Sequence, residues 1–167
     1  MKSENVSVRT SKLHGQGVFA NRSFNSGDTI LLIDDTHVIQ DESKVATEDK
    51  NHLDFLADEK IVLMQAPEVY INHSCDPNTY VKTIGGVRHL FAMKDISESD
   101  EITYDYAING DFEMAAECKC GAKECRKVIN SFWKLSKKRQ LEYLPYLDDW
   151  FVEKYSDKIA TLRQLVS

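Results

Sequence analysis

The first two thirds of the chain contain short runs of apolar residues separated by turn-forming residues. Asn5 to Arg9 alternates polar and apolar residues, as a half-buried strand does. Thr29 to Ile33 is a nearly continuous apolar run of the kind found in buried strands. Gly85-Gly86 lies between two such runs and predicts a tight hairpin. The predicted strands are Asn5 to Arg9, Val18 to Ala20, Thr29 to Ile33, Thr79 to Ile84, Val87 to Met93 and Glu101 to Tyr104.

The pattern changes to a helical spacing near the C-terminus. Ser136 is a suitable N-cap for a helix that runs to Leu144 and is stopped by Pro145. A second helix is predicted from about Asp148, because apolar residues recur there at intervals of three and four. We interpret this stripe as a packing face. It consists of Phe151, Tyr155, Ile159, Leu162 and Val166.

Residues 41 to 67 follow neither period clearly. The spacing of apolar residues there allows a helical turn or two between Leu53 and Met64. With the strands before and after this segment, the sequence predicts a mainly β fold with short C-terminal helices.

The composition is that of an ordinary globular domain. The 167 residues are 42% hydrophobic and 29% charged. Because no apolar run approaches the roughly 20 residues of a membrane helix, and the first residues lack the apolar region of a signal peptide, we expect a soluble intracellular protein. Whether it acts in the nucleus or the cytoplasm is left open. The net charge of −6 disfavours direct nucleic-acid binding and suits a basic partner.

Three cysteines lie close together near residue 120. Cys118, Cys120 and Cys125 form a C-x-C-x4-C pattern, with Gly121 available for a tight turn. Nothing in the sequence indicates the oxidising compartment that disulfides require, so this spacing favours zinc, which takes four ligands in structural sites. Cys75 is the one other cysteine of the chain and a candidate fourth ligand. The alternative is that Cys75 is a small buried apolar side chain.

Cys75 belongs to the segment INHSCDPNTY, residues 71 to 80, which has three readings. It can be a nucleophile with His73 as its base, half of a metal site, or a polar turn with a buried cysteine. Two other short patterns carry candidate chemistry. Gly15-Gln16-Gly17 lies between two strand-like stretches, and Tyr104 and Tyr106 lie on the same side of an extended segment.

The order of these motifs is more specific than any one of them. G-x-G-V-F-A, N-H-S-C-D-P-N, E-I-T-Y-D-Y and C-x-C-G-x3-C follow one another as in the SET-domain protein lysine methyltransferases with a zinc-binding post-SET segment, which the chain resembles over about residues 5 to 130. The resemblance implies a SET domain over 1–110, a post-SET zinc segment over 111–130 and a helical extension over 131–167. It also implies the β-clip SET fold, with a pseudoknot between the segments that bear Asn72-His73 and Tyr106.

The resemblance assigns roles to individual residues. Tyr106 takes the position of the catalytic tyrosine, and Tyr104 and Tyr106 line the channel for the substrate lysine. The residues implied to contact S-adenosylmethionine are Gly15, Gln16, Gly17, Asn72, His73, Tyr106 and Phe132. The adenine is implied to be covered by Phe132 or Trp133. The implied ligands of one structural zinc ion are Cys75, Cys118, Cys120 and Cys125.

The implied reaction transfers a methyl group to the side-chain amine of a protein lysine. Free lysine has a pKa of about 10.4, so only about one amine in a thousand is neutral near physiological pH, and an apolar channel beside a sulfonium lowers that cost. Tyr104 stands where the family has Phe or Tyr, which predicts mono- or dimethylation. The expected partner is a protein with a basic lysine-containing segment, such as a histone tail.

Three other functions fit parts of the sequence. One is a non-catalytic SET-fold module that keeps zinc and binds a protein. Another is an enzyme in which Cys75 is the nucleophile and His73 its base. The third is a nucleic-acid-binding zinc knuckle, which the acidic composition disfavours. The substrate lysine and the oligomeric state are not determined by the sequence.

Overall fold

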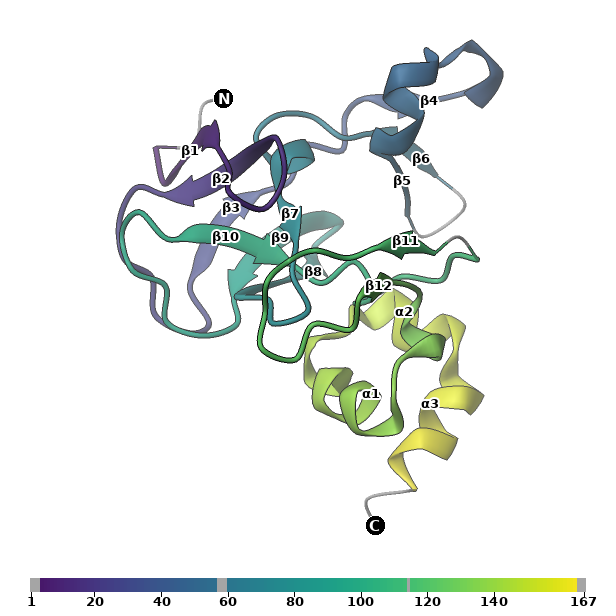
Figure 1. Ribbon diagram of the computed structural model, residues 1–167. Helices are drawn as coiled ribbons and strands as arrows, with labels where there is room; N and C mark the ends of the chain where they lie inside the picture. The colour runs from purple at the N-terminus through teal and green to yellow at the C-terminus, as the bar shows by residue number, and fades with distance from the viewer. Residues whose placement is uncertain (1–3, 57–59, 114, 165–167) are drawn as a thin grey trace.

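The computed structural model describes residues 4–56, 60–113 and 115–164. It is built mainly of short β-strands, with a small helical region at the C-terminal end of the chain (Figure 1). The largest sheet contains seven strands. They are β1 (Val6–Thr10), β2 (Gln16–Ala20), β3 (Thr29–Leu32), β7 (Asn72–His73), β8 (Thr79–Ile84), β9 (Val87–Ala92) and β10 (Glu101–Tyr104).

The strand β10 is the centre of this sheet. The strand order is β1-β2-β10-β8-β9-β3, and β7 also pairs with β10. The β7 and β10 strands are parallel, with Thr103 opposite Asn72 and Tyr104 opposite His73. This pairing brings the N-H-S-C segment beside the T-Y-D-Y segment. All six predicted strands and the β8–β9 hairpin are confirmed, whereas the threading of a pseudoknot stays a prediction.

The segment from residue 38 to residue 63 forms a separate small sheet. Two 3₁₀ turns, Glu42–Lys44 and Thr47–His52, lead into strands that pair in the order β4-β6-β5. Our prediction of a helical turn between Leu53 and Met64 is therefore wrong for the described residues; residues 57–59 lie outside them. Short apolar runs cannot distinguish helix from strand, and here cross-strand pairing decides. The strands are β4 (Val38–Ile39), β5 (Leu53–Phe55) and β6 (Ile61–Leu63).

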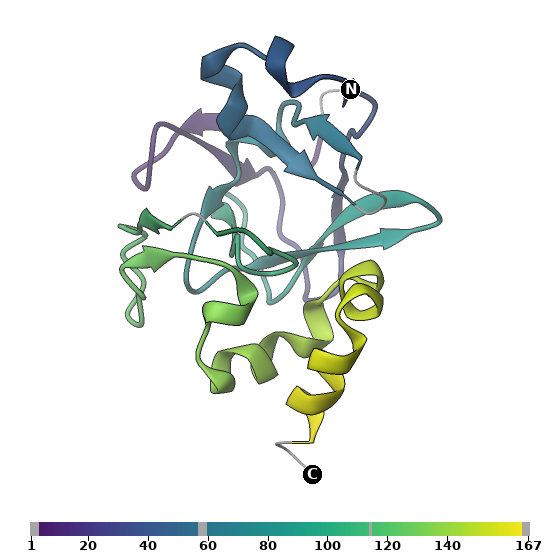
Figure 2. The same ribbon diagram turned by 90° about the vertical axis from the view of Figure 1, so that its right-hand side faces the viewer.

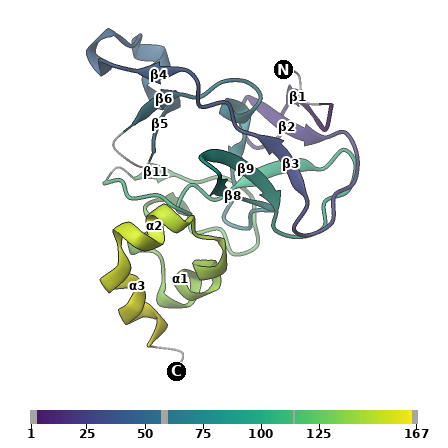
Figure 3. The same cartoon turned by 180° about the vertical axis from the view of Figure 1, so that it is seen from behind.

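The chain then forms a cysteine-containing loop and the helical region. Strands β11 (Ala116–Glu117) and β12 (Val128–Ile129) pair and enclose the three clustered cysteines. The helices lie at the end of the molecule opposite the small sheet (Figures 2 and 3). They are α1 (Lys137–Tyr143), α2 (Asp149–Lys154) and α3 (Ser156–Arg163). Further 3₁₀ turns lie at Glu68–Tyr70, before β7, and at Phe132–Lys134 and Leu144–Tyr146 in the helical region.

Both helix predictions can be compared with these bounds. Ser136 caps α1 as predicted, since its Oγ accepts a hydrogen bond from the backbone N–H of Arg139. The second helix begins where it was predicted, with Asp148 as the N-cap of α2, but it is divided in two, because Tyr155 has φ −114° and ψ 31° and separates α2 from α3. The Tyr155 ring packs on Phe151 and Trp133, and its hydroxyl bonds Asp111. Tyr155 keeps helical hydrogen bonds to both helices, from its N–H to the Phe151 oxygen and from the Ile159 N–H to its own oxygen, so the break is confined to this one residue.

Two apolar cores stabilise the fold. One lies within the large sheet, and the other joins the helices to the loop after β10. The predicted stripe belongs to the second core: Phe151, Ile159 and Leu162 are buried, and Val166 is outside the described residues. Tyr104 packs against both cores, so the end of β10 is held from two sides. None of the helices in the described part of the chain is long and apolar enough to span a membrane.

Candidate functional site

A cavity of about 730 Å³ opens beside the end of β10. Its walls come from the loop before β2, from β5, from the Glu68–Tyr70 turn and β7, from the residues around Tyr104 and from the start of α2. Residues far apart in the chain therefore meet there. The wall residues used below are His14, Gly15, Gln16, Asp54, Glu68, Ile71, Asn72, Arg88, Tyr104, Tyr106, Ile108, Phe112 and Asp148.

One part of the wall is the loop before β2 together with Asn72. The Asn72 side-chain amide donates to the carbonyl oxygens of His14 and Gln16, at 3.2 and 2.9 Å. Gly15 has a φ of +44°, a conformation that glycine adopts without steric cost. Gly15, Gln16 and Asn72 thus lie together at the cavity, and their contact with a cofactor stays a prediction. Gly17 is buried and is not among the wall residues.

Tyr106 lies next to this loop. Its hydroxyl donates to the backbone oxygen of Ile71 at 2.9 Å, and 41% of the residue is exposed. Its ring meets the edge of the His73 ring, with centroids 5.2 Å apart. The surrounding protein removes water from the phenol and raises the pKa of Tyr106 above its usual value. Tyr106 is therefore a neutral hydroxyl at physiological pH.

Tyr104 forms the adjacent wall. Its hydroxyl donates to the backbone oxygen of Ile108 at 2.6 Å, which fixes the ring against the cavity. Burial raises the pKa of Tyr104, so this hydroxyl is also neutral. Both tyrosines that were expected to form a lysine channel thus face one cavity.

His73 lies behind the cavity wall. Its side chain is 4% exposed, and its Nδ1 accepts a hydrogen bond of 3.3 Å from the backbone N–H of Tyr106. Burial lowers the pKa of His73 to about 4, although Asp105 opposes this shift. His73 is therefore a neutral ring that supports Tyr106 from behind. His73 is not among the wall residues of the cavity, so its contact with the cofactor stays a prediction.

Phe132 is also away from the cavity. It is fully buried among the aromatic residues of the second core, with its ring against Trp133 and Phe151. The aromatic wall residue from the neighbouring loop is Phe112, which the sequence did not single out. A role of Phe132 as a cover for the cofactor stays a prediction.

The four cysteines form a compact cluster. Their sulfur atoms all lie within 4.8 Å of one another, and Cys118 Sγ is 3.7 Å from the sulfurs of Cys75 and Cys125. A tetrahedral zinc site with Zn–S bonds of about 2.3 Å has sulfurs about 3.8 Å apart. Burial opposes ionisation of Cys120, but hydrogen bonds from the backbone N–H groups of Cys75 and Ala122 and from the Cys118 and Cys125 thiols together lower the pKa of Cys120 to about 7. These four soft donors fit a structural zinc ion.

The rival reading of Cys75 as a nucleophile is not supported by this geometry. His73 Nε2 does lie 3.5 Å from Cys75 Sγ. However, Cys75 is fully buried and outside the cavity wall, and burial raises the pKa of its thiol. A protonated, inaccessible thiol beside a neutral histidine cannot attack a substrate.

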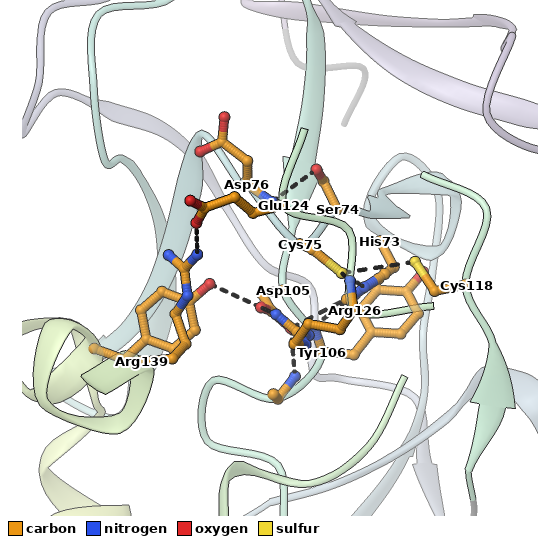
Figure 4. A network of polar contacts seen from close by, with 12 residues as sticks. His73, Ser74, Cys75, Asp76, Asp105, Tyr106, Cys118, Glu124, Arg126 and Arg139 are labelled. Carbon is orange, nitrogen blue, oxygen red and sulfur yellow. Dashed lines mark hydrogen bonds and ion pairs between the residues drawn. The ribbon is translucent and has the colours of Figure 1, made fainter. Parts of the chain in front are cut away.

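A buried carboxylate connects the cysteine cluster to the tyrosines. Asp105, between Tyr104 and Tyr106, is fully buried and accepts two hydrogen bonds of 2.7 and 2.8 Å from the Arg126 guanidinium (Figure 4). It also accepts from the Tyr143 hydroxyl at 2.8 Å. The backbone N–H of Arg126 points at Cys75 Sγ, 3.4 Å away. Asp105 thus joins β10, the cysteine loop and α1.

The sequence reading missed Asp105 and Arg126. Two features of the sequence could have drawn attention to them: Asp105 lies between the two candidate tyrosines, and Arg126 directly follows Cys125. Neither feature indicates that the two residues form a pair.

We expect Asp105→Asn to lower the free energy of unfolding by about 3 kcal/mol, because it leaves the Arg126 charge without its buried partner. Chemical denaturation monitored by circular dichroism measures this change. Asp76→Asn is the control, since Asp76 pairs with Lys94 at the surface and should cost less than about 1 kcal/mol. Equal stability of the native and Asp105→Asn proteins would contradict the importance of this pair.

Comparisons with known proteins agree with this architecture. The SET domain family matches residues 15–107, which is more than half of the chain, and the chain belongs to that family. It is 30% identical over 138 residues to the histone-lysine N-methyltransferase trithorax of Drosophila virilis, covering 75% of this chain and 4% of that protein. It is also 30% identical over 142 residues to histone-lysine N-methyltransferase 2B of Homo sapiens, covering 76% of this chain and 5% of the relative. The chain therefore spans only a small part of these relatives.

A solved structure is similar as well. The crystal structure of KRYPTONITE in complex with mCHG DNA and SAH superposes with a TM-score of 0.56 and 26% identity. The match covers 75% of this chain and 29% of that one. The predicted SET fold, mainly β with short C-terminal helices, is confirmed by this likeness and by the family match.

Proposed function

We propose that this chain transfers a methyl group from S-adenosylmethionine to the side-chain amine of a protein lysine. The observation that carries the proposal is the common cavity of Gly15, Gln16, Asn72, Tyr104 and Tyr106. The same cavity is lined by the residues that the resemblance implies to contact the methyl donor and by the two tyrosines that it implies to line the lysine channel. The names of the relatives and the SAH in the KRYPTONITE complex support the same chemistry.

The chemistry requires positioning and a neutral amine. Methyl transfer is an in-line displacement in which the lysine nitrogen attacks the methyl carbon and the sulfonium becomes a thioether. Tyr104 and Tyr106 are neutral and partly buried, so they form a wall with little capacity to stabilise an ammonium ion by charge. The Tyr106 hydroxyl, held by Ile71, is placed to orient the methyl group and the amine.

Zinc would hold the cysteine-containing loop between β11 and β12, which follows β10 in the chain. In this proposal Cys75, Cys118, Cys120 and Cys125 are its four ligands, which leaves no open position for substrate or water. The ion would cross-link Cys75 to the loop that bears the other three cysteines. The protein itself connects this site to β10, because Arg126 donates hydrogen bonds to both Cys75 Sγ and the Asp105 carboxylate.

The proposed substrate is a basic protein segment such as a histone tail. Asp54, Glu68 and Asp148 are among the residues that line the cavity, and Arg88 is the arginine among them. Arg88 is already paired with Asp35 and Asp54. Asp54 is therefore balanced by Arg88, and it is the net charge of −6 of the whole chain that favours a segment with positive residues near the target lysine. The names of the histone-lysine methyltransferase relatives support the same class.

The test is incubation with methyl-tritiated S-adenosylmethionine and a panel of core histones and cell lysate. The proposal predicts label on at least one basic protein, at a rate that depends on enzyme concentration. A protein that binds the donor and labels nothing in the panel would favour the alternative, a non-catalytic SET-fold module. Bovine serum albumin serves as the acidic control substrate.

Tyr104→Phe is expected to raise the number of methyl groups added to the lysine. The tyrosine hydroxyl occupies space beside the amine and is fixed by Ile108, so its removal gives a methylated amine room to turn. Mass spectrometry of the product should shift from mono- and dimethyllysine toward trimethyllysine, with the total rate within about tenfold of native. Efficient trimethylation by the native protein would contradict this role for Tyr104.

A further inference from the structure

The first residue of β10 carries a carboxylate that joins three distant segments. We propose that Glu101 is a positioning residue that holds the loop before β2 and Asn72 in the shape that binds the methyl donor. We further infer that residue 17 is glycine because the Glu101 carboxylate lies against it. This inference rests on the function proposed above and names the residue that organises its donor site.

Glu101 receives hydrogen bonds from both sides of the cavity loop. Its Oε1 accepts from Ser11 Oγ at 2.8 Å and from Asn72 Nδ2 at 2.8 Å. Its Oε2 accepts from the same serine at 2.9 Å. The residues are 90 and 29 positions apart in the sequence, so this carboxylate connects segments that no local structure joins. Hydrogen bonds to an ionised acceptor are stronger than neutral ones.

Ser11 transmits this contact to the loop. Its Oγ accepts hydrogen bonds from the backbone N–H groups of Leu13 and His14, at 2.8 and 3.4 Å. Its own backbone N–H donates to the oxygen of Gly15 at 2.9 Å. The turn that presents Gly15 and Gln16 to the cavity is therefore closed by the residue that Glu101 holds.

Asn72 closes the loop from the other side. Its Nδ2 donates to the oxygens of His14 and Gln16 as well as to Glu101. Three acceptors around one amide nitrogen fix which way the side chain is turned. Glu101 is thus one of the three groups that fix the orientation of Asn72 at the cavity.

The two glycines of the loop are required for different reasons. Gly15 has a positive φ, and nothing lies within 4 Å of the position where a Cβ would be. At Gly17 the same position is 2.4 Å from Glu101 Oε1 and 2.9 Å from Ser11 Cβ. A side chain at residue 17 would therefore displace the carboxylate, whereas one at residue 15 would strain only the backbone.

The decisive experiment measures binding of S-adenosylhomocysteine by isothermal titration calorimetry. Glu101→Gln keeps the size of the side chain but removes its charge and one acceptor, so we expect the dissociation constant to rise tenfold or more. At saturating donor, kcat should remain within about twofold of native while KM for the donor rises. Glu98→Gln, at an exposed carboxylate three residues earlier, should leave both values unchanged.

A double-mutant cycle tests the reason for glycine. Gly17→Ala should weaken binding strongly in the native background and clearly less in a Glu101→Ala background, because the closer of the two atoms it meets, Glu101 Oε1, is gone while Ser11 Cβ remains. Ser11→Ala should weaken binding in the same direction as Glu101→Gln and should not add to it. If Gly17→Ala is equally harmful in both backgrounds, the proposed reason for this glycine is wrong.

The outcomes separate this inference from the proposed function. If the native protein does not bind S-adenosylhomocysteine, both fail. If native and Glu101→Gln bind equally well, or if Glu101→Gln lowers kcat with KM unchanged, the positioning role of Glu101 fails alone. Thermal unfolding of each variant shows whether weaker binding comes from misfolding. If Glu101→Gln is misfolded, Ser11→Ala decides the question through its dissociation constant for S-adenosylhomocysteine and its KM for the donor.

Discussion

Tyr106→Phe is expected to reduce methyl transfer at least a hundredfold and to leave donor binding within about twofold of native. The substitution removes one hydroxyl and keeps the ring that packs against His73. That hydroxyl is held at 2.9 Å from the Ile71 oxygen, so it is oriented before the substrate arrives. Loss of one preorganised hydrogen-bonding group at a reacting centre costs about 10²- to 10³-fold in rate. Single-turnover kinetics with labelled donor measures the effect on the chemical step.

Tyr146→Phe is the matched control for this substitution. Tyr146 packs on Tyr80 and is not among the cavity wall residues. It should retain nearly native rates. If Tyr106→Phe transfers methyl groups as fast as this control, Tyr106 is not the catalytic tyrosine. If it instead loses donor binding with an unchanged single-turnover rate, its role is structural.

Cys75→Ser is expected to lose bound zinc and the folded cysteine loop together. Cys75 is fully buried among the other three sulfurs, and a serine hydroxyl is a poor replacement for a thiolate ligand. Binding of a structural zinc ion contributes about 10 kcal/mol or more of apparent free energy to small zinc domains. Inductively coupled plasma mass spectrometry should therefore find one zinc per native chain and almost none in the variant.

The loss of zinc in Cys75→Ser should also lower methyl transfer, because contacts of Arg126 connect the zinc site to the residues beside Tyr106. Arg126 directs its backbone N–H at Cys75 Sγ and its guanidinium at Asp105, next to Tyr106. We expect Cys75→Ser to lower methyl transfer at least tenfold, and a strong chelator to do the same to the native protein. Asp76→Asn is the neighbouring control and should keep both zinc and activity. A metal-free native protein with full activity would contradict the structural role of the site.

Much of the site could be predicted because its chemistry is concentrated in short motifs. Asn72 and Tyr106 lie in contiguous segments, and the β7–β10 pairing brings those segments together. The cysteine spacing in 118–125 similarly predicts a cluster that the structure forms with Cys75. Local patterning was also sufficient for the β8–β9 hairpin and for the Ser136 cap.

The features that the sequence did not reveal depend on distant contacts. Asp105 meets Arg126 across 21 positions, and Glu101 meets Ser11 across 90, with no spacing rule to indicate either pair. Phe132 could not be distinguished from a surface aromatic, yet the packing of the helices buries it completely. The strands within 53–63 were missed because two three-residue runs carry too few positions to define a period.

The central claim is that the cavity of Tyr104 and Tyr106 delivers a methyl group to a lysine side chain. The most direct measurement uses S-adenosylmethionine with a deuterated methyl group and a core-histone substrate, followed by tandem mass spectrometry that locates the label. The account predicts deuterated methyl groups on lysine side-chain nitrogens, one or two per residue, and almost none with Tyr106→Phe. Donor bound at the site with label on no lysine, or with label only on other residue types, would contradict it.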